Sequence, residues 1–93
     1  MARDLPKQVN TLKVYPNPTP GEFRLQFNAP EAFAGKVLIL DLNGKQLQEQ
    51  KFSLVKGNND IGLSLAAYAK GTYVAVVYNS NNTLVATQVV VKQ

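Results

Sequence analysis

The chain has 93 residues, 45% of them hydrophobic, which fits one small globular domain with a single core. It contains no cysteine and no histidine, which excludes disulfides, thiolate nucleophiles, Cys- or His-based metal sites and a histidine general base. The six acidic residues are scattered, and the net charge of +4 comes from basic residues spaced along the whole chain. We therefore expect no enzyme, no metal site, no cofactor and no nucleic-acid partner.

Residues 1–10 are polar and contain one proline, so we predict a linker there and a single domain over residues 11–93. No stretch approaches the roughly 20 apolar residues that a membrane helix needs. No apolar core follows Arg3, so the start does not resemble a signal peptide. We interpret the chain as a domain taken from a longer protein, with an initiator Met added.

A proline-rich segment at residues 15–21 separates two alternating apolar stretches. Prolines fix φ and remove backbone donors, the residue before a proline is held extended, and glycine permits a φ that other residues resist. We predict a rigid corner between two strands, at which no sheet ladder continues. Its residues are Tyr15, Pro16, Asn17, Pro18, Thr19, Pro20 and Gly21.

Short apolar runs then recur about every ten residues with turn signals between them, which is typical of an all-β sandwich or barrel. Phe23, Leu25 and Phe27 alternate with polar residues and predict a half-buried strand. Residues 28–35 read as a loop whose Phe33 plugs one end of the core. Residues 37–40 are apolar on both parities, which predicts a central strand covered on both sides.

The next segment predicts a hairpin with an irregular return strand. Asn43 and Gly44 favour a type I′ turn, which we expect Asp41 to cap through backbone amides, ahead of Lys45. Leu47 and Phe52 have opposite parity, so we predict a β-bulge near residues 49–51.

The rest of the chain predicts further strands at residues 61–65, 72–78 and 83–92. About seven antiparallel strands fit an immunoglobulin-like β-sandwich without its disulfide. Gly71 and Tyr73 invite comparison with the tyrosine corner of such sandwiches, a structural role. Lys13, Lys51 and Lys92, if on edge strands, discourage edge-to-edge pairing, so we expect any homodimer through sheet edges to be weak.

Four pieces in this order resemble one family, the C-terminal sorting domain of type IX secretion system cargo proteins. They are the 15–21 segment followed by Phe23 and Leu25; Val37 and Ile39 leading into residues 41–45; residues 61–65 with Lys70, Gly71, Thr72, Tyr73, Val74 and Val76; and Thr87 with residues 89–92. The resemblance covers residues 12–93. No single piece is specific, but the ordered set is.

The resemblance implies a recognition tag rather than a catalyst. Such a domain directs its parent cargo protein from the periplasm through an outer-membrane type IX translocon. A sortase-like protease then usually removes the domain, and many cargoes are attached to the cell surface. The implied location is secreted or at the cell surface, as part of a larger precursor.

The terminal strand is the expected site of recognition, through Val89, Val91 and Lys92. Family members often carry a basic residue shortly before the final apolar strand, where this chain has Gln88, and Gln93 follows the last lysine. A receptor could grip such a strand by strand addition at its edge.

A different class of function remains open on the residues alone, a carbohydrate-binding or adhesion sandwich of a secreted protein. Such modules offer aromatic platforms, and this chain has four tyrosines but no tryptophan.

Overall fold

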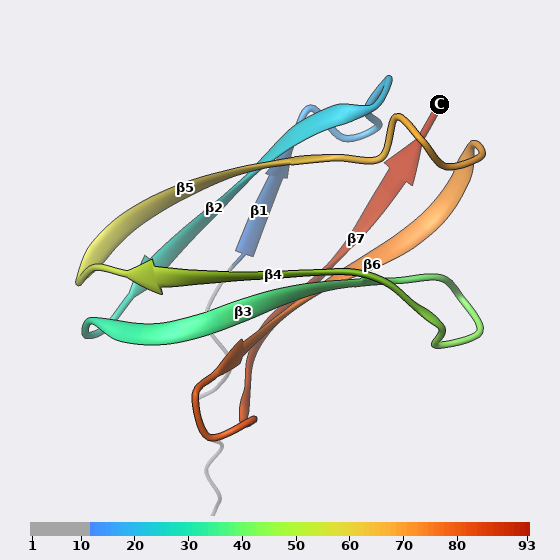
Figure 1. The fold of residues 1–93 in the computed structure, drawn as a ribbon. Coiled ribbons are helices and arrows are strands. Elements are labelled where there is room, and N and C mark those ends of the chain that lie inside the picture. The colour runs from blue at the N-terminus through green and yellow to red at the C-terminus, as the bar shows by residue number, and fades with distance from the viewer. Residues whose placement is uncertain (1–11) are drawn as a thin grey trace, which may run out of the picture.

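A computed structural model describes residues 12–93, which form seven β-strands and no helix (Figure 1). The strands are β1 (Leu12–Tyr15), β2 (Glu22–Ala29), β3 (Phe33–Leu40), β4 (Gln46–Leu54), β5 (Gly57–Ser64), β6 (Gly71–Asn79) and β7 (Leu84–Lys92). Accordingly, no helix that could cross a membrane is found in this part of the chain. The linker predicted for residues 1–10 lies outside the described residues.

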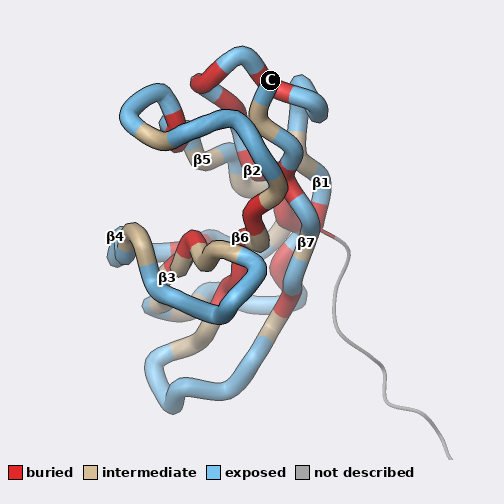
Figure 2. The backbone as a smooth tube through the Cα atoms, turned by 90° about the vertical axis from the view of Figure 1, so that its right-hand side faces the viewer, coloured by how far each residue is buried: buried red, intermediate tan, exposed pale blue. Residues whose placement is uncertain are grey.

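The strands make two antiparallel sheets, one with the order β1-β2-β5 and the other with the order β4-β3-β6-β7. The sheets stack as two layers, and the buried segments lie between them (Figure 2). The predicted all-β sandwich is confirmed. Lys13, Lys51 and Lys92 fall on β1, β4 and β7, which are edge strands, as edge protection requires.

The core forms because alternate side chains of each strand point into the space between the sheets. In β2 the exposed and buried residues alternate without a break, and Phe23, Leu25 and Phe27 are each at most 2% exposed. Val37 and Ile39 of β3 belong to the same apolar cluster. The period-two reading of the sequence therefore identified the inward-facing residues of β2.

The predicted loop over residues 28–35 is wrong in extent, because β2 continues to Ala29 and β3 begins at Phe33. Phe33 nevertheless packs against the core, with its ring edge-on to Phe27 at 6.5 Å between centroids. Gly35 explains why β3 can start so early. A Cβ at this position would lie 2.7 Å from the carbonyl oxygen of Tyr78, so only glycine permits this approach of β3 to β6.

The hairpin after β3 differs from its prediction in two details. The bulge lies at Leu47, because Ile39 pairs with Gln48 and Leu40 with Gln46, whereas residues 49–51 pair regularly. The side chain of Leu47 packs against the core, which is why the irregularity falls there. The turn is not type I′, since Gly44 has a positive φ of 85° and Asn43 does not.

The prediction that residues 37–40 are covered on both sides is also wrong within the described chain. Leu38 and Leu40 are half-buried and lie outside the core cluster, on the outer face of the four-stranded sheet. No other layer of residues 12–93 packs over that face, because the three-stranded sheet covers the inner one.

Candidate functional site

The corner segment, residues 15–21, lies along the end of β7, so the first and last pieces of the sequence pattern meet in space. The segment connects β1 to β2, and β1 also contacts β7. In Figure 2 the β1 and β7 strands run side by side at one edge of the sandwich. Two residues of the segment, Asn17 and Thr19, hydrogen-bond the backbone of β7 and of Gln93.

The side-chain amide of Asn17 pairs with β7 as a backbone peptide group of a neighbouring strand would, with one donor and one acceptor. Its Nδ2 donates to the carbonyl oxygen of Val89 at 3.0 Å, and its Oδ1 accepts from the Val91 amide at 2.9 Å. These backbone groups lie at the edge of β7 that faces away from β6. The Tyr15–Pro16 and Asn17–Pro18 peptide bonds, one before and one after the Pro16–Asn17 dipeptide, are cis.

Thr19 continues the pairing with its own backbone. Its amide donates to Val91 O and its carbonyl accepts from Gln93 N, both at 2.8 Å, forming an isolated parallel bridge with Lys92. The prediction that no ladder continues at the corner is therefore wrong at one residue. Thr19 is not a proline and keeps the amide that the bridge needs.

The side chain of Thr19 ties the corner together from inside. Thr19 is fully buried, and its hydroxyl donates to Glu22 O at 2.7 Å and accepts from Gly21 N at 3.0 Å. Gly21 is buried against Ala66 and accepts a hydrogen bond from Leu65 N, and its φ is not positive. The predicted need for an unusual φ at this position is therefore wrong.

The three predicted recognition residues face different ways. Val89 and Val91 are 46% and 36% exposed, whereas Val90 between them is fully buried in the core. Lys92 is half-buried, and its Nζ donates to Tyr68 O at 2.8 Å. Tyr68 in turn donates its hydroxyl to Leu47 O. The two valines are open to a partner, while the lysine is already engaged within the domain.

The remaining motif residues have structural contacts. Tyr73 is buried, and its hydroxyl donates to Ala69 O four residues earlier, the arrangement that a tyrosine corner predicts. Gly71 pairs with Lys92. Asp41 caps its turn, since Oδ1 accepts from Asn43 N and Lys45 N.

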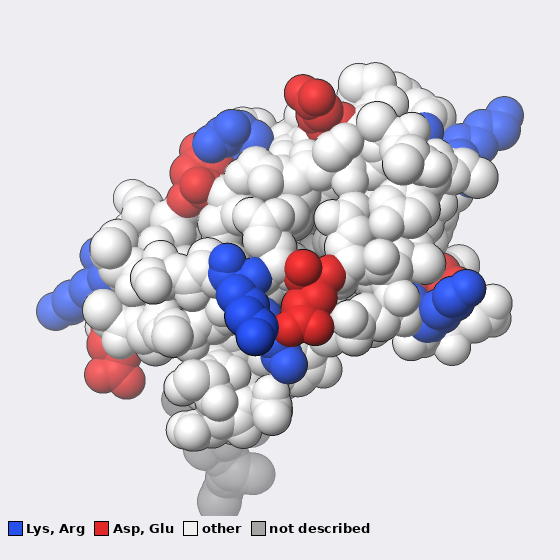
Figure 3. All heavy atoms as spheres, in the orientation of Figure 1, with Lys and Arg blue, Asp and Glu red and all other residues white. Residues whose placement is uncertain are grey.

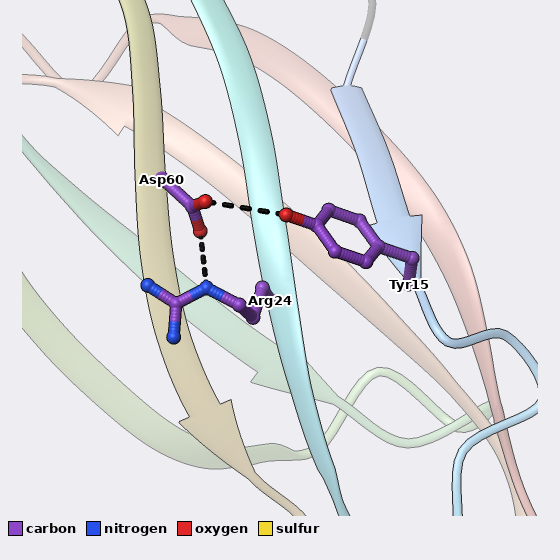
Figure 4. Close-up of polar contacts among 3 residues, drawn as sticks. All are labelled: Tyr15, Arg24 and Asp60. Atoms are coloured by element: carbon purple, nitrogen blue, oxygen red, sulfur yellow. Dashed lines mark hydrogen bonds and ion pairs between the residues drawn. The ribbon is translucent and has the colours of Figure 1, made fainter.

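Tyr15 takes part in a polar cluster on the outer face of the three-stranded sheet (Figure 4). Its hydroxyl donates to one oxygen of Asp60 at 3.2 Å, and the Arg24 Nε donates to the other. The hydrogen bond and charge of Asp60 raise the pKa of Arg24, a guanidinium that is charged in proteins in any case. Because the pair is exposed, it contributes little to stability.

No group of three or more potential metal-binding acids occurs among residues 12–93. The tyrosines do not form a platform, because Tyr73 is in the core, Tyr68 packs against it, and Tyr15 and Tyr78 lie on different sheets. Sequence reasoning missed the role of Thr19 in holding the corner segment to β7. The available signal was a hydroxyl residue between two prolines.

Comparison with known families matches residues 13–92 to the secretion system C-terminal sorting domain. No curated protein is found to match this chain. The family is one of sorting signals and not a catalytic family. Membership implies a parent cargo protein, a secretion machinery, and export to the cell surface or secretion through the outer membrane. The chain therefore belongs to the secretion system C-terminal sorting domain family, and it is a sorting signal for type IX secretion.

Proposed function

We propose that this domain delivers its parent cargo from the periplasm to the outer-membrane type IX translocon, and that Val89, Val91 and Lys92 are read there. A sortase-like protease then removes the domain, and the cargo is attached at the cell surface. The observation that carries the proposal is the exposure of two valine side chains on a strand whose intervening residue is core. Exposed branched apolar side chains at the end of a strand suit a partner better than water.

The mode of reading follows from what occupies the edge of β7. Strand addition needs unpaired backbone groups. The carbonyl of Val89 and the amide of Val91 are hydrogen-bonded to the Asn17 side chain, and the carbonyl of Val91 accepts from the Thr19 amide. Adding a partner strand there would require removal of the corner segment. We therefore favour a partner that contacts the valine side chains and leaves the edge paired.

Lys92 has a different part in this scheme. An ammonium group has three donors, and one of them is directed at Tyr68 O. The others are available to an acidic group of the partner. This contact adds to the internal hydrogen bond and need not replace it.

The test uses residues 1–93 fused to an inert periplasmic carrier in a host with the secretion system. Val89→Ser combined with Val91→Ser is expected to lower surface delivery at least about tenfold, and Lys92→Gln by less. Val55→Ser is the matched control, since Val55 is 58% exposed and lies outside β7. Delivery of the folded double variant at the level of the parent fusion would remove these residues from the proposal.

Removal of the domain gives a separate readout. We expect the molecular mass of the surface-delivered carrier to be lower than that of its precursor by the mass of the domain. An uncleaved carrier at the surface would contradict the protease step and leave the sorting step standing. Any self-association through edges is expected to be weak, because Lys13 and Lys51 lie on edge strands.

A further inference from the structure

We infer that the translocon-docking surface is the outer face of the four-stranded sheet. Val89 and Val91 of β7 form one border of this face. This inference rests on the proposed function and extends it. The face carries six aliphatic residues, which we call the outer patch: Leu38, Leu40, Val74, Val76, Val89 and Val91.

Strand register places these residues together. Leu40 pairs with Val74, and Val74 pairs with Val89, so one row of three aliphatic residues crosses β3, β6 and β7. Leu38 pairs with Val76 in the neighbouring row. Cross-strand partners on one face lie about 4.5–5.5 Å apart between Cβ atoms, so the rows form a continuous surface.

The outer patch is not part of the core. Val76 is only 6% exposed, yet it is outside the core cluster that contains Tyr73, Ala75 and Val77 of the same strand. Its burial comes from its neighbours on the outer face. Leu38, Leu40 and Val74 are half-buried in the same way and do not pack against the core.

The two outer faces of the sandwich differ in composition. The outward residues of β2 on the three-stranded sheet are all polar: Glu22, Arg24, Gln26 and Asn28. A sheet whose outer face meets only water shows this alternation, whereas runs apolar on both parities are typical of strands covered on both sides. The aliphatic face is therefore the one that a partner covers.

The direction of approach points to the same face. The edge of β7 is occupied by Asn17 and Thr19, and its inner side is occupied by core residues such as Val90. A partner that contacts Val89 must come from outside the sheet. It then also contacts Val74, which is directly beside Val89 in the register.

The surroundings of the patch indicate the chemistry of the partner. Lys36 and Lys51 lie opposite each other next to the patch, and Lys36 Nζ is 6.0 Å from the ring centroid of Tyr78. Neither lysine forms an ion pair with another residue of the 12–93 segment. The acidic residue Glu49, which is opposite Leu38 in the register, also borders the patch. In the view of Figure 3, charges of both signs are spread over the surface. The fitting partner is a flat, aliphatic or aromatic protein surface with an acidic rim near these lysines, belonging to the translocon.

The test is Leu40→Thr combined with Val74→Thr in the carrier fusion. Threonine has the β-branched shape of valine and is favoured in strands, and at both positions it makes the face polar. Surface delivery is expected to fall at least about tenfold, with the urea midpoint of the purified domain close to that of the parent. The matched control, Leu42→Thr with Val55→Thr, changes two exposed apolar residues outside the patch and should deliver normally.

Normal delivery by the folded patch variant would overturn this inference and leave the sorting function intact. Failure of the unsubstituted fusion would instead overturn the proposed function. If the variant is unstable, Val74→Thr alone decides the matter at a temperature where it is folded. Lys36→Glu with Lys51→Glu should also reduce delivery, and unchanged delivery would contradict the acidic rim. Concentration-dependent dimers of the purified domain that the patch variant abolishes would assign the face to a second copy and overturn the translocon assignment.

Discussion

At the scale of single residues, Thr19 does more than its place between two prolines suggests. Its backbone holds the end of β7, and its buried hydroxyl satisfies backbone groups of Gly21 and Glu22. Buried polar groups without partners are costly, so this residue has no apolar substitute of equal value.

Thr19→Val keeps the shape and removes the hydroxyl. We expect a loss of about 1–3 kcal/mol in the free energy of unfolding, because the Gly21 amide and the Glu22 carbonyl each lose a partner. In urea unfolding this loss appears as a lower midpoint concentration with an unchanged m-value. A midpoint equal to that of the parent would show that water or a shifted backbone replaces the hydroxyl.

Asn17→Asp tests the amide that pairs with β7. The acceptor for Val91 N is kept, but the donor to Val89 O is replaced by a carboxylate oxygen facing a carbonyl. We expect a loss of about 1–2 kcal/mol and faster hydrogen exchange at the end of β7, with the amide of Val77 in β6 as the internal reference. Unchanged exchange at Val91 and Gln93 would mean that Asn17 does not hold the strand.

At the scale of elements, the close approach of β3 and β6 depends on Gly35. Gly35→Ala is expected to cost about 1–3 kcal/mol, since the new Cβ would lie 2.7 Å from a backbone oxygen that cannot move alone. Gly62→Ala is the control, because its nearest neighbour at 3.4 Å is the end of the Arg24 side chain. Equal stability of the two variants would contradict this account of β3.

The elements were predictable where the sequence has a period of two, as in β2, and where the parity of Leu47 and Phe52 required a bulge. The position of the bulge was not predictable, because parity indicates only that the phase changes between those residues. The contact between Asn17 and Val91 spans 74 residues, and nothing local in either segment encodes that register. The exposure of Val89 was not predictable either, because it depends on which face of the four-stranded sheet the other sheet covers.

At the scale of the whole molecule, the corner segment and the terminal strand form one structural unit at the edge of the sandwich. This unit presents Val89 and Val91 on the same face as Leu40 and Val74. The fold thus gathers pieces from both ends of the sequence pattern onto one side of the domain. The central claim is that this domain is sufficient to sort a cargo.

The most direct test is delivery of a periplasmic carrier fused to residues 1–93, compared in a host with the type IX system and in the same host lacking its translocon. We predict carrier at the cell surface or in the medium of the first host, and carrier retained in the periplasm of the second. Retention in both hosts, with the domain folded, would contradict the central claim.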